Sequence, residues 1–468
     1  MLNMAYSGAI KSTLYGLYLS FFEAEFTLLS WRLFGLLFVS AAMVISGILV
    51  KDRIPRLSLA AFLALLLSDG SCLIMCRHDW GPVALALSIR LVFLAFWLRG
   101  ETDPELRPGN SLALGVCVGL AVFEKLSSAT LLIPLLLILA FSRRRRFWPH
   151  WLGGGAGVLA GASPLILVNA YTLLEHGFMV SLRGVVLTPA LTWAGFLRYA
   201  TDYLFLGNGS LARGFVLGER ATGAPAVLEG WLLSILLLLT AASLVIVRSR
   251  SRWKAPALLA LAVYLLTSVA IYLLPQNTWI HHWILGTPFQ YLAIVLACAA
   301  LTPDDAFAGV GSKRLVWAMR VSVALFLCLR VCGLISLQTA LWEGRSAVTW
   351  DPSLNRFAEF SARQADQAAF IAADLGIANQ VVCLGNGETQ VFEQFWAFRG
   401  AEDIQYVIDK SRKAVIYVVV KNPPSRVAPE NTARILAAMR ATPGWREAPP
   451  EQEVADLRAV RVYKFVKS

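Results

Sequence analysis

Charged residues are scarce in this sequence: only 15% of its 468 residues are Asp, Glu, Lys or Arg, against about 25% in an average soluble protein. Hydrophobic residues make up 57% and occur in blocks of roughly 15 to 22, long enough to cross about 30 Å of hydrocarbon. This pattern excludes an ordinary soluble protein and predicts a polytopic α-helical membrane protein. The net charge of +12 comes largely from arginines in short loops, as positive-inside orientation requires, and does not indicate nucleic-acid binding.

Disulfide, zinc and nucleotide signatures are also missing. Six of the seven cysteines lie in or beside apolar segments, and Cys72/Cys76 and Cys328/Cys332 are each four residues apart. This spacing fits neither a disulfide framework nor a zinc site, so we interpret these cysteines as small packing residues. The glycines of CLGNGETQ (383–390) form no GxGxxG, and no P-loop lysine follows them.

The apolar blocks predict about ten spans. They cover residues 31–50, 57–76, 81–98, 110–123, 128–142, 151–170, 230–248, 255–274, 283–301 and 315–336. Basic turns at 51–56, 143–146 and 248–254 alternate with less basic turns and are therefore predicted to be cytoplasmic. The other turns, a long loop at about 171–229 and the C-terminal tail then lie on the outer face. We expect a bacterial inner membrane protein whose tail is periplasmic or extracellular.

The tail, residues 341–468, is predicted to form a small α/β domain separate from the transmembrane domain at 1–340. Its segment 352–376 shows helical periodicity, whereas QVVCLG (380–385), AVIYVVV (414–420) and AVRVYKFVK (459–467) are typical of strands. PENTARILAAMRATPG (429–444) predicts a helix that begins at Pro429. We interpret the domain as a structural cap over the outer face rather than a nucleotide site.

Polar residues gather at the outer ends of the predicted spans. They are Lys11, Arg32, Asp69, Arg77, His78, Asp79, Glu124, Lys125, Glu175, His176, His281 and His282. Each has a structural alternative: a snorkelling side chain, a local ion pair or a half-solvated histidine. Together they suit transfer from a lipid-linked phosphate, because cations or a metal stabilise a departing phosphate and a carboxylate deprotonates an acceptor hydroxyl.

The first residues predict an interfacial helix over about 5–22. Tyr6, Ile10, Leu14, Leu17 and Phe21 fall on one helical face in this segment. An apolar face on a short, partly polar helix is typical of a helix that lies flat in the membrane interface.

Five stretches, in order, resemble the GT-C membrane glycosyltransferases, in particular the protein-mannosyltransferase and aminoarabinose-transferase group. They are YSGAIKSTLYGLYLSFFEAEFTLLSWRLFGLL (6–37), CRHDWGPVALAL (76–87), GLAVFEKLSSATLLIPLLLILAFSRRRRF (119–147), GASPLILVNAYTLLEHGF (161–178) and HHWILGTPFQYLAIVLA (281–297). The resemblance covers about residues 1–300, and the tail resembles the small periplasmic domain of some members.

The resemblance implies transfer of a sugar, with inversion, from a polyprenyl-phosphate or polyprenyl-diphosphate carrier to a glycan, lipid or protein acceptor. It implies substrate contact, chiefly to phosphate, for Lys11, Lys125, His281 and His282. Asp79 corresponds to an acid that binds metal or substrate in the group, so a divalent metal ion is the one cofactor that the resemblance suggests.

The group's catalytic acid follows a first span and precedes the interfacial helix, but the first acidic residue here is Glu23. We therefore expect the catalytic carboxylate upstream of Met1, lost to a mis-assigned start codon or a truncation. One more span would also return the N-terminus to the cytoplasm. The alternatives are an inactive relative and a lipid-linked oligosaccharide flippase or transporter, although a transporter usually shows repeated halves and we find no internal repeat.

Overall fold

The computed structural model describes residues 2–4, 7–78, 83–103, 106–141, 147–182, 192–218, 224–247, 251–273, 280–301, 310–347, 350–394, 398–423 and 429–468. The chain divides into two compact units. The helical unit comprises Met1–Ala24, Trp31–Gly214 and Arg220–Leu337. The α/β unit comprises Glu25–Ser30, Phe215–Glu219 and Gln338–Ser468.

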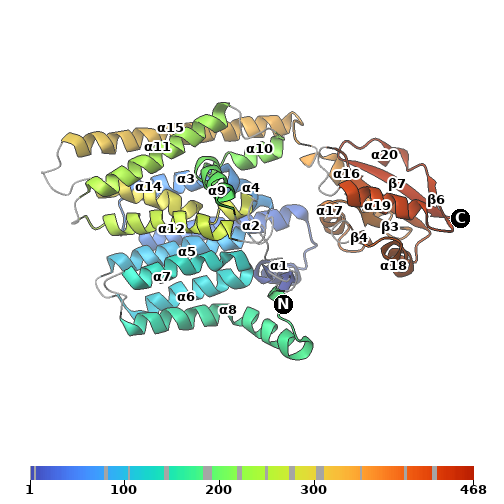
Figure 1. Cartoon of the computed structure of the whole chain (residues 1–468), viewed down its shortest axis with the longest axis horizontal. Helices are drawn as coiled ribbons and strands as arrows, with labels where there is room; N and C mark the ends of the chain where they lie inside the picture. Colours follow the sequence, from blue (N-terminus) through green and yellow to red (C-terminus); the bar gives the residue numbers. More distant parts are fainter. Residues whose placement is uncertain are drawn as a thin grey trace. The chain divides into compact units, whose positions relative to one another are not determined.

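Helices form wherever the sequence has an apolar block, and Figure 1 shows most of them running alongside one another. They are α1 (Ile10–Phe21), α2 (Leu28–Val50), α3 (Arg56–Leu67), α4 (Gly70–His78), α5 (Val83–Thr102), α6 (Pro108–Glu124), η1 (Leu126–Leu131), α7 (Leu132–Phe141), α8 (Trp148–His176), η2 (Val180–Leu182), α9 (Trp193–Leu206), α10 (Leu211–Leu217), α11 (Ala224–Ile246), α12 (Lys254–Tyr272), α13 (Ile280–Trp283), α14 (Thr287–Leu301) and α15 (Val310–Trp342). Each predicted span overlaps one of these helices or a consecutive pair of them, which confirms the polytopic helical architecture.

Six helices of the described residues are long and apolar enough to cross a membrane: α2, α5, α8, α11, α12 and α15. The pair α3 and α4 passes the same test together but is bent by 60°. The helices α6, η1–α7 and α14 are apolar but shorter. The described residues therefore contain several helices that could cross a membrane, together with apolar helices that are shorter than a full bilayer crossing.

Glycines allow α6 and α8 to approach backbone to backbone. Gly115 and Gly119 of α6 face Gly157 and Gly161 of α8, and a Cβ built at Gly157 would lie only 2.3 Å from the carbonyl oxygen of Leu112. Such small-residue interfaces are a common way for helices to associate in membranes, where close van der Waals packing replaces the hydrophobic effect. This contact determines where the end of α6 lies.

The predicted outer loop at about 171–229 contains helices of its own. The helix α8 continues to His176, and α9 and α10 occupy much of the remainder. Tyr199 and Tyr203 of α9 pack edge-on against Trp283 of α13, with ring centroids 6.1 and 6.0 Å away. The loop is therefore anchored to the short helix that carries the histidine pair.

A buried ion pair lies where α3 bends into α4. The Asp69 carboxylate accepts a hydrogen bond from the Cys72 amide at 2.8 Å, which caps α4, and pairs with Arg330 of α15 at 3.3 Å. The Tyr291 hydroxyl of α14 accepts a hydrogen bond from Arg330 and donates one to Asp69. Arg330 also donates to the carbonyl of Asn208, between α9 and α10. One network therefore joins α4, α14, α15 and the outer loop.

The α/β unit contains a five-stranded sheet with the order β4-β3-β5-β7-β6. Its strands are β3 (Ala368–Ala372), β4 (Val391–Glu393), β5 (Val415–Lys421), β6 (Trp445–Ala448) and β7 (Val460–Lys467). The strands β4, β3 and β5 are parallel, while β7 and β6 are antiparallel to their neighbours.

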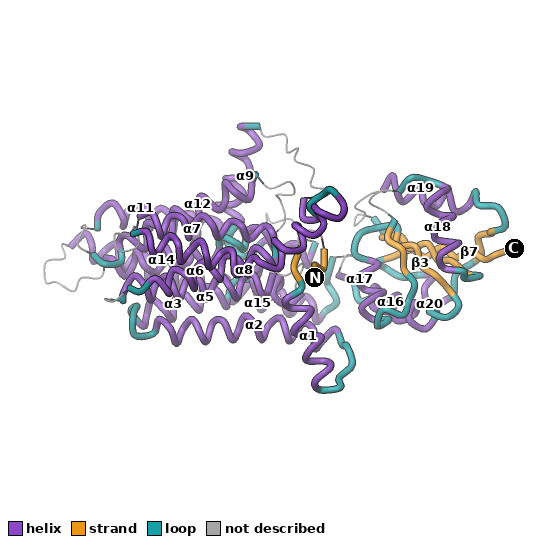
Figure 2. Tube along the Cα trace, turned by 90° about the horizontal axis from the view of Figure 1, so that it is seen from below, coloured by secondary structure: helices purple, strands orange, loops and turns teal. Residues whose placement is uncertain are grey.

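Helices cover both faces of this sheet (Figure 2). They are α16 (Ser353–Arg363), α17 (Ile377–Leu384) and α20 (Gln452–Ala455) on one face, and α18 (Ala401–Ser411) and α19 (Pro429–Arg440) on the other. The predicted small C-terminal α/β domain is confirmed.

Two local predictions in this unit were wrong. The helical pattern of 352–376 continues only to Arg363, and Ala368–Ala372 forms the fully buried strand β3. The predicted strand QVVCLG lies in α17, which buries Ile377, Ala378 and Val381 along one side. A short apolar run fits either a buried strand or a helix, so its secondary structure depends on whether it lies in the sheet or in a helix layer that covers the sheet.

We predict that Gly157→Ala destabilises the protein by about 1–3 kcal/mol, because the added Cβ must push the two backbones apart. Gly155 is the matched control on the same helix, since a Cβ there meets nothing within 4 Å. Gly155→Ala should be neutral or slightly stabilising because alanine favours the helix. Melting temperatures in detergent test this, and equal values for the two variants would contradict the packing argument.

We predict that Asp69→Asn and Arg330→Met each cost roughly 3–5 kcal/mol, because each leaves a buried partner without its counter-charge. The double variant Asp69→Leu/Arg330→Leu should cost less than the sum of the single leucine variants, since it leaves neither charge uncompensated. A thermal double-mutant cycle measures this coupling. Additive losses would show that the pair does not act as a unit.

Candidate functional site

Lys125 lies at the junction between α6 and η1. Its backbone is extended, with φ −152° and ψ 116°, while its amide still donates to the Ala121 carbonyl at 2.9 Å. A single extended residue thus separates the two helices, and its side chain is only 4% exposed. The chain therefore holds an ammonium group inside the helical unit, where it is costly unless it serves a purpose.

Arg90 of α5 binds η1, the helix that follows this junction. Its guanidinium donates to the hydroxyls of Ser128 and Thr130 in η1, both at 3.2 Å, and to the Ala86 carbonyl at 3.1 Å. The side chain is 1% exposed. Arg90 therefore fixes the segment that follows Lys125.

His281 and His282 come from the four-residue helix α13, and their ring centroids are 4.1 Å apart. Burial, together with the nearby charge of Lys125, lowers the pKa of His281 to about 2 and that of His282 to about 3. Both imidazoles are therefore neutral at physiological pH, so each can donate one hydrogen bond and accept another.

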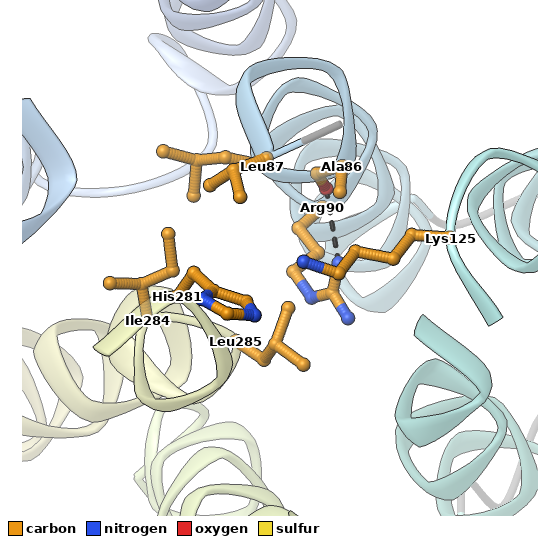
Figure 3. Close-up of a pocket in the computed structure, with 8 residues that line it drawn as sticks. Ala86, Leu87, Arg90, Lys125, His281, Ile284 and Leu285 are labelled. Carbon is orange, nitrogen blue, oxygen red and sulfur yellow. Dashed lines mark hydrogen bonds between the residues drawn. The ribbon is translucent and has the colours of Figure 1, made fainter. Parts of the chain in front are cut away.

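Lys125, Arg90 and His281 point into the same narrow cavity (Figure 3). The space between its lining side chains is too narrow to hold a water molecule. Val83, Ala86 and Leu87 continue the lining along one side of α5. A phosphate group therefore enters only if the lining side chains move apart.

Lys11 lies beside this region, on α1. The amide of the preceding residue, Ile10, donates to the Glu124 carboxylate at 3.0 Å, so the start of α1 is bound to the end of α6. Lys11 is 2% exposed, and its ammonium lies 3.7 Å above the centroid of the Trp31 ring, a cation–π contact. Gly35 makes room for it, since a Cβ there would lie 3.1 Å from Nζ.

An open apolar groove of about 590 Å³ lies between α1 and the first half of α2. Its walls are Leu14, Leu17, Tyr18, Phe21, Phe22, Phe34, Leu37, Phe38 and Ala41. Three of the side chains predicted on the apolar face of the interfacial helix, Leu14, Leu17 and Phe21, line it. The groove suits an extended hydrocarbon chain better than a polar ligand.

The predicted site residues separate into three groups. Lys125 and His281 line one cavity, and the His282 ring lies against that of His281 at an angle of 49°. Lys11 lies on the adjoining α1 with its ammonium on Trp31. Asp79, the predicted metal ligand, lies outside the described residues. Within those residues no three or more His, Cys, Asp or Glu side chains gather as a metal site needs.

Arg90 is the member of this site that sequence reasoning missed. The signal was present, because an arginine in the middle of a predicted span is expensive and commonly functional. It was hidden because its partners, Ser128 and Thr130, belong to another helix pair.

Comparison with known proteins shows similarity in structure but not in sequence. No protein-family model and no curated protein matches the chain. ArnT from Cupriavidus metallidurans bound to undecaprenyl phosphate superposes with a TM-score of 0.55 at 13% identity, covering 99% of this chain and 88% of ArnT. ArnT in the apo state gives a TM-score of 0.54 at 15% identity, covering 92% and 82%.

At this level of identity the similarity concerns the fold. It agrees with the fold that the resemblance of the five sequence stretches implies. The chain therefore shares the overall fold of the two ArnT structures.

Proposed function

We propose that this protein transfers a sugar from a polyprenyl-phosphate carrier to an acceptor at the outer face of the membrane. The observation that carries the proposal is the cavity of Lys125, Arg90 and His281 in a GT-C fold, with the start of α1 bound to Glu124, the neighbour of Lys125. The helix α1 also forms one wall of the apolar groove. A neighbour in structure, ArnT, was solved with undecaprenyl phosphate bound. That ligand combines the two chemistries that the cavity and the groove would accept.

In this proposal the Lys125 ammonium stabilises the negative charge that develops on the phosphate as the sugar leaves. A buried cation is effective there because little water screens it. The neutral His281 and His282 imidazoles would orient the phosphate by hydrogen bonding without competing for its protons. The groove between α1 and α2 would hold the isoprenoid chain, and Lys11 would approach the phosphate from the start of α1.

The base that activates the acceptor is not assigned among the described residues. Among the described residues, the helical unit buries three carboxylates, those of Asp69, Glu124 and Glu229. Asp69 pairs with Arg330, Glu229 pairs with Arg213, and Glu124 binds the Ile10 amide. Each carboxylate is therefore committed to a structural contact.

We predict that Lys125→Ala reduces sugar transfer by about 100- to 1,000-fold, the usual cost of removing one group that stabilises developing negative charge. The assay is release of labelled sugar from a polyprenyl-phosphate donor in proteoliposomes, with envelope extract as the source of acceptors. Lys51→Ala is the matched control, since Lys51 is an exposed lysine in a turn.

Wild-type transfer by folded Lys125→Ala would remove Lys125 from the site. Movement of the carrier across the vesicle membrane without transfer would instead support a flippase and contradict the proposal.

We predict that the protein loses stability as pH falls below about 6.5, because the unfolded histidines bind protons that the folded ones, with pKa values of about 2 and 3, do not. The loss is at most about 1.4 kcal/mol per pH unit for each histidine. Melting temperatures between pH 7.5 and 4.5 should fall less steeply in His281→Asn/His282→Asn. His176→Asn, at an exposed position, should keep the wild-type slope; equal slopes in all three proteins would contradict the buried neutral pair.

A further inference from the structure

Arg90 carries a buried charge that no carboxylate balances among the residues that the structure describes. Its hydrogen bonds go to a carbonyl and two hydroxyls, which are neutral groups. With the side chain 1% exposed, water compensates little of the charge either. A buried guanidinium in this situation is expensive, because neutral dipoles replace only part of the lost hydration.

Elsewhere the same helical unit balances its inner arginines with carboxylates. Arg330 pairs with Asp69 at 3.3 Å, and Arg213 pairs with Glu229 at 3.0 Å. Both of those pairs join helices and have an evident structural role. Arg90 differs from them in its partners and in its position, since it lines a cavity.

The cavity brings a second cation to Arg90. Figure 3 shows Lys125 and Arg90 directed into one space, with His281 across from them. Both side chains are positively charged, so an anion that entered the cavity would be attracted by both of them. The lining residues Val83, Ala86, Leu87 and Arg90 follow one face of α5 over two helical turns, about 10 Å. Arg90 therefore lies at the far end of the cavity from the start of α5.

We propose that Arg90 is a phosphate-binding residue, whose guanidinium is neutralised by the phosphate of the ligand and not by the protein. The inference rests on the proposed function for the identity of the ligand, a lipid-linked phosphate. It adds a specificity-determining contact: guanidinium donors in a fixed fork suit two phosphate oxygens at once, whereas Lys125 supplies a point charge. Ser128 and Thr130 hold that fork in place.

The experiment compares Arg90→Met, Arg90→Lys and Arg99→Met in the full chain in detergent. Arg99 lies on the same helix but is exposed, so it is the matched control. Binding of undecaprenyl phosphate, undecaprenol and inorganic phosphate is measured by thermal shift. Arg90→Met should weaken undecaprenyl phosphate binding by about 10- to 100-fold, the range for losing a charged hydrogen bond. It should leave undecaprenol binding unchanged, and Arg90→Lys should fall between Met and wild type.

The ligand-free melting temperature separates this role from a purely structural one. If Arg90 binds an anion, Arg90→Met removes an unbalanced charge, and this gain offsets the loss of the hydrogen bonds to Ser128 and Thr130, so that temperature should change little. A lower melting temperature together with unchanged affinity for undecaprenyl phosphate would overturn the inference. If Arg90→Met does not accumulate, Arg90→Gln takes its place, and equal affinity in the Lys and Gln variants would also overturn it.

The thermal shifts with undecaprenyl phosphate and with inorganic phosphate show which kind of phosphate Arg90 binds. A shift with undecaprenyl phosphate alone assigns the contact to the lipid head group, and a shift with inorganic phosphate as well assigns it to phosphate in general. Both results support Arg90 as a phosphate ligand if Arg90→Met reduces them. Binding that depends on Arg90 without any sugar transfer would contradict the proposed enzyme but not this contact. Transfer that is unaffected in Arg90→Met would contradict the contact alone.

Discussion

The cost of a charge inside an apolar helix bundle governs this structure. Asp69, at the bend between α3 and α4, can stay buried because Arg330 and Tyr291 bind it, and this requirement brings α14 and α15 to the same point. Arg330 in turn reaches the Asn208 carbonyl, so the outer loop is tied to the bundle by the same charge. Glu229 and Arg213 repeat the arrangement. A few directional polar contacts thus fix how the helices pack, because the apolar contacts around them are non-directional.

The position of α6 connects this framework to the candidate site. Glycines allow α6 to approach α8 closely. The end of the helix then presents two adjacent charged residues with different roles, because Glu124 binds the start of α1 while Lys125 enters the cavity with Arg90 and His281. The glycine contact between α6 and α8 therefore determines where Lys125 lies. The cavity is too narrow for water in this conformation.

Much of the candidate site could be predicted from the sequence, because polar residues at the ends of apolar spans are unusual enough to stand out. Lys125 and His281 were among them and do share a cavity. Lys11, predicted to contact phosphate, lies on the adjoining α1 with its ammonium over the Trp31 ring, and its contact with phosphate stays a prediction. Arg90 was overlooked because a sequence does not show which side chains meet. Its interest comes from having no carboxylate partner among the described residues. In the α/β unit, QVVCLG was mistaken for a strand because a short apolar run fits either a strand or a helix.

The sequence by itself determined that this chain forms a helical membrane protein with a small α/β domain, since span length and the exclusion of charge act on contiguous residues. It also carried enough ordered similarity to indicate the GT-C fold. Which charges are balanced by other side chains, in contrast, depends on how the helices pack in three dimensions. Asp69 and Arg330 meet across α3, α4 and α15, whereas the partners of Arg90 among the described residues are neutral groups, and it lines a cavity together with Lys125. Such pairings arise from helix packing between distant parts of the chain.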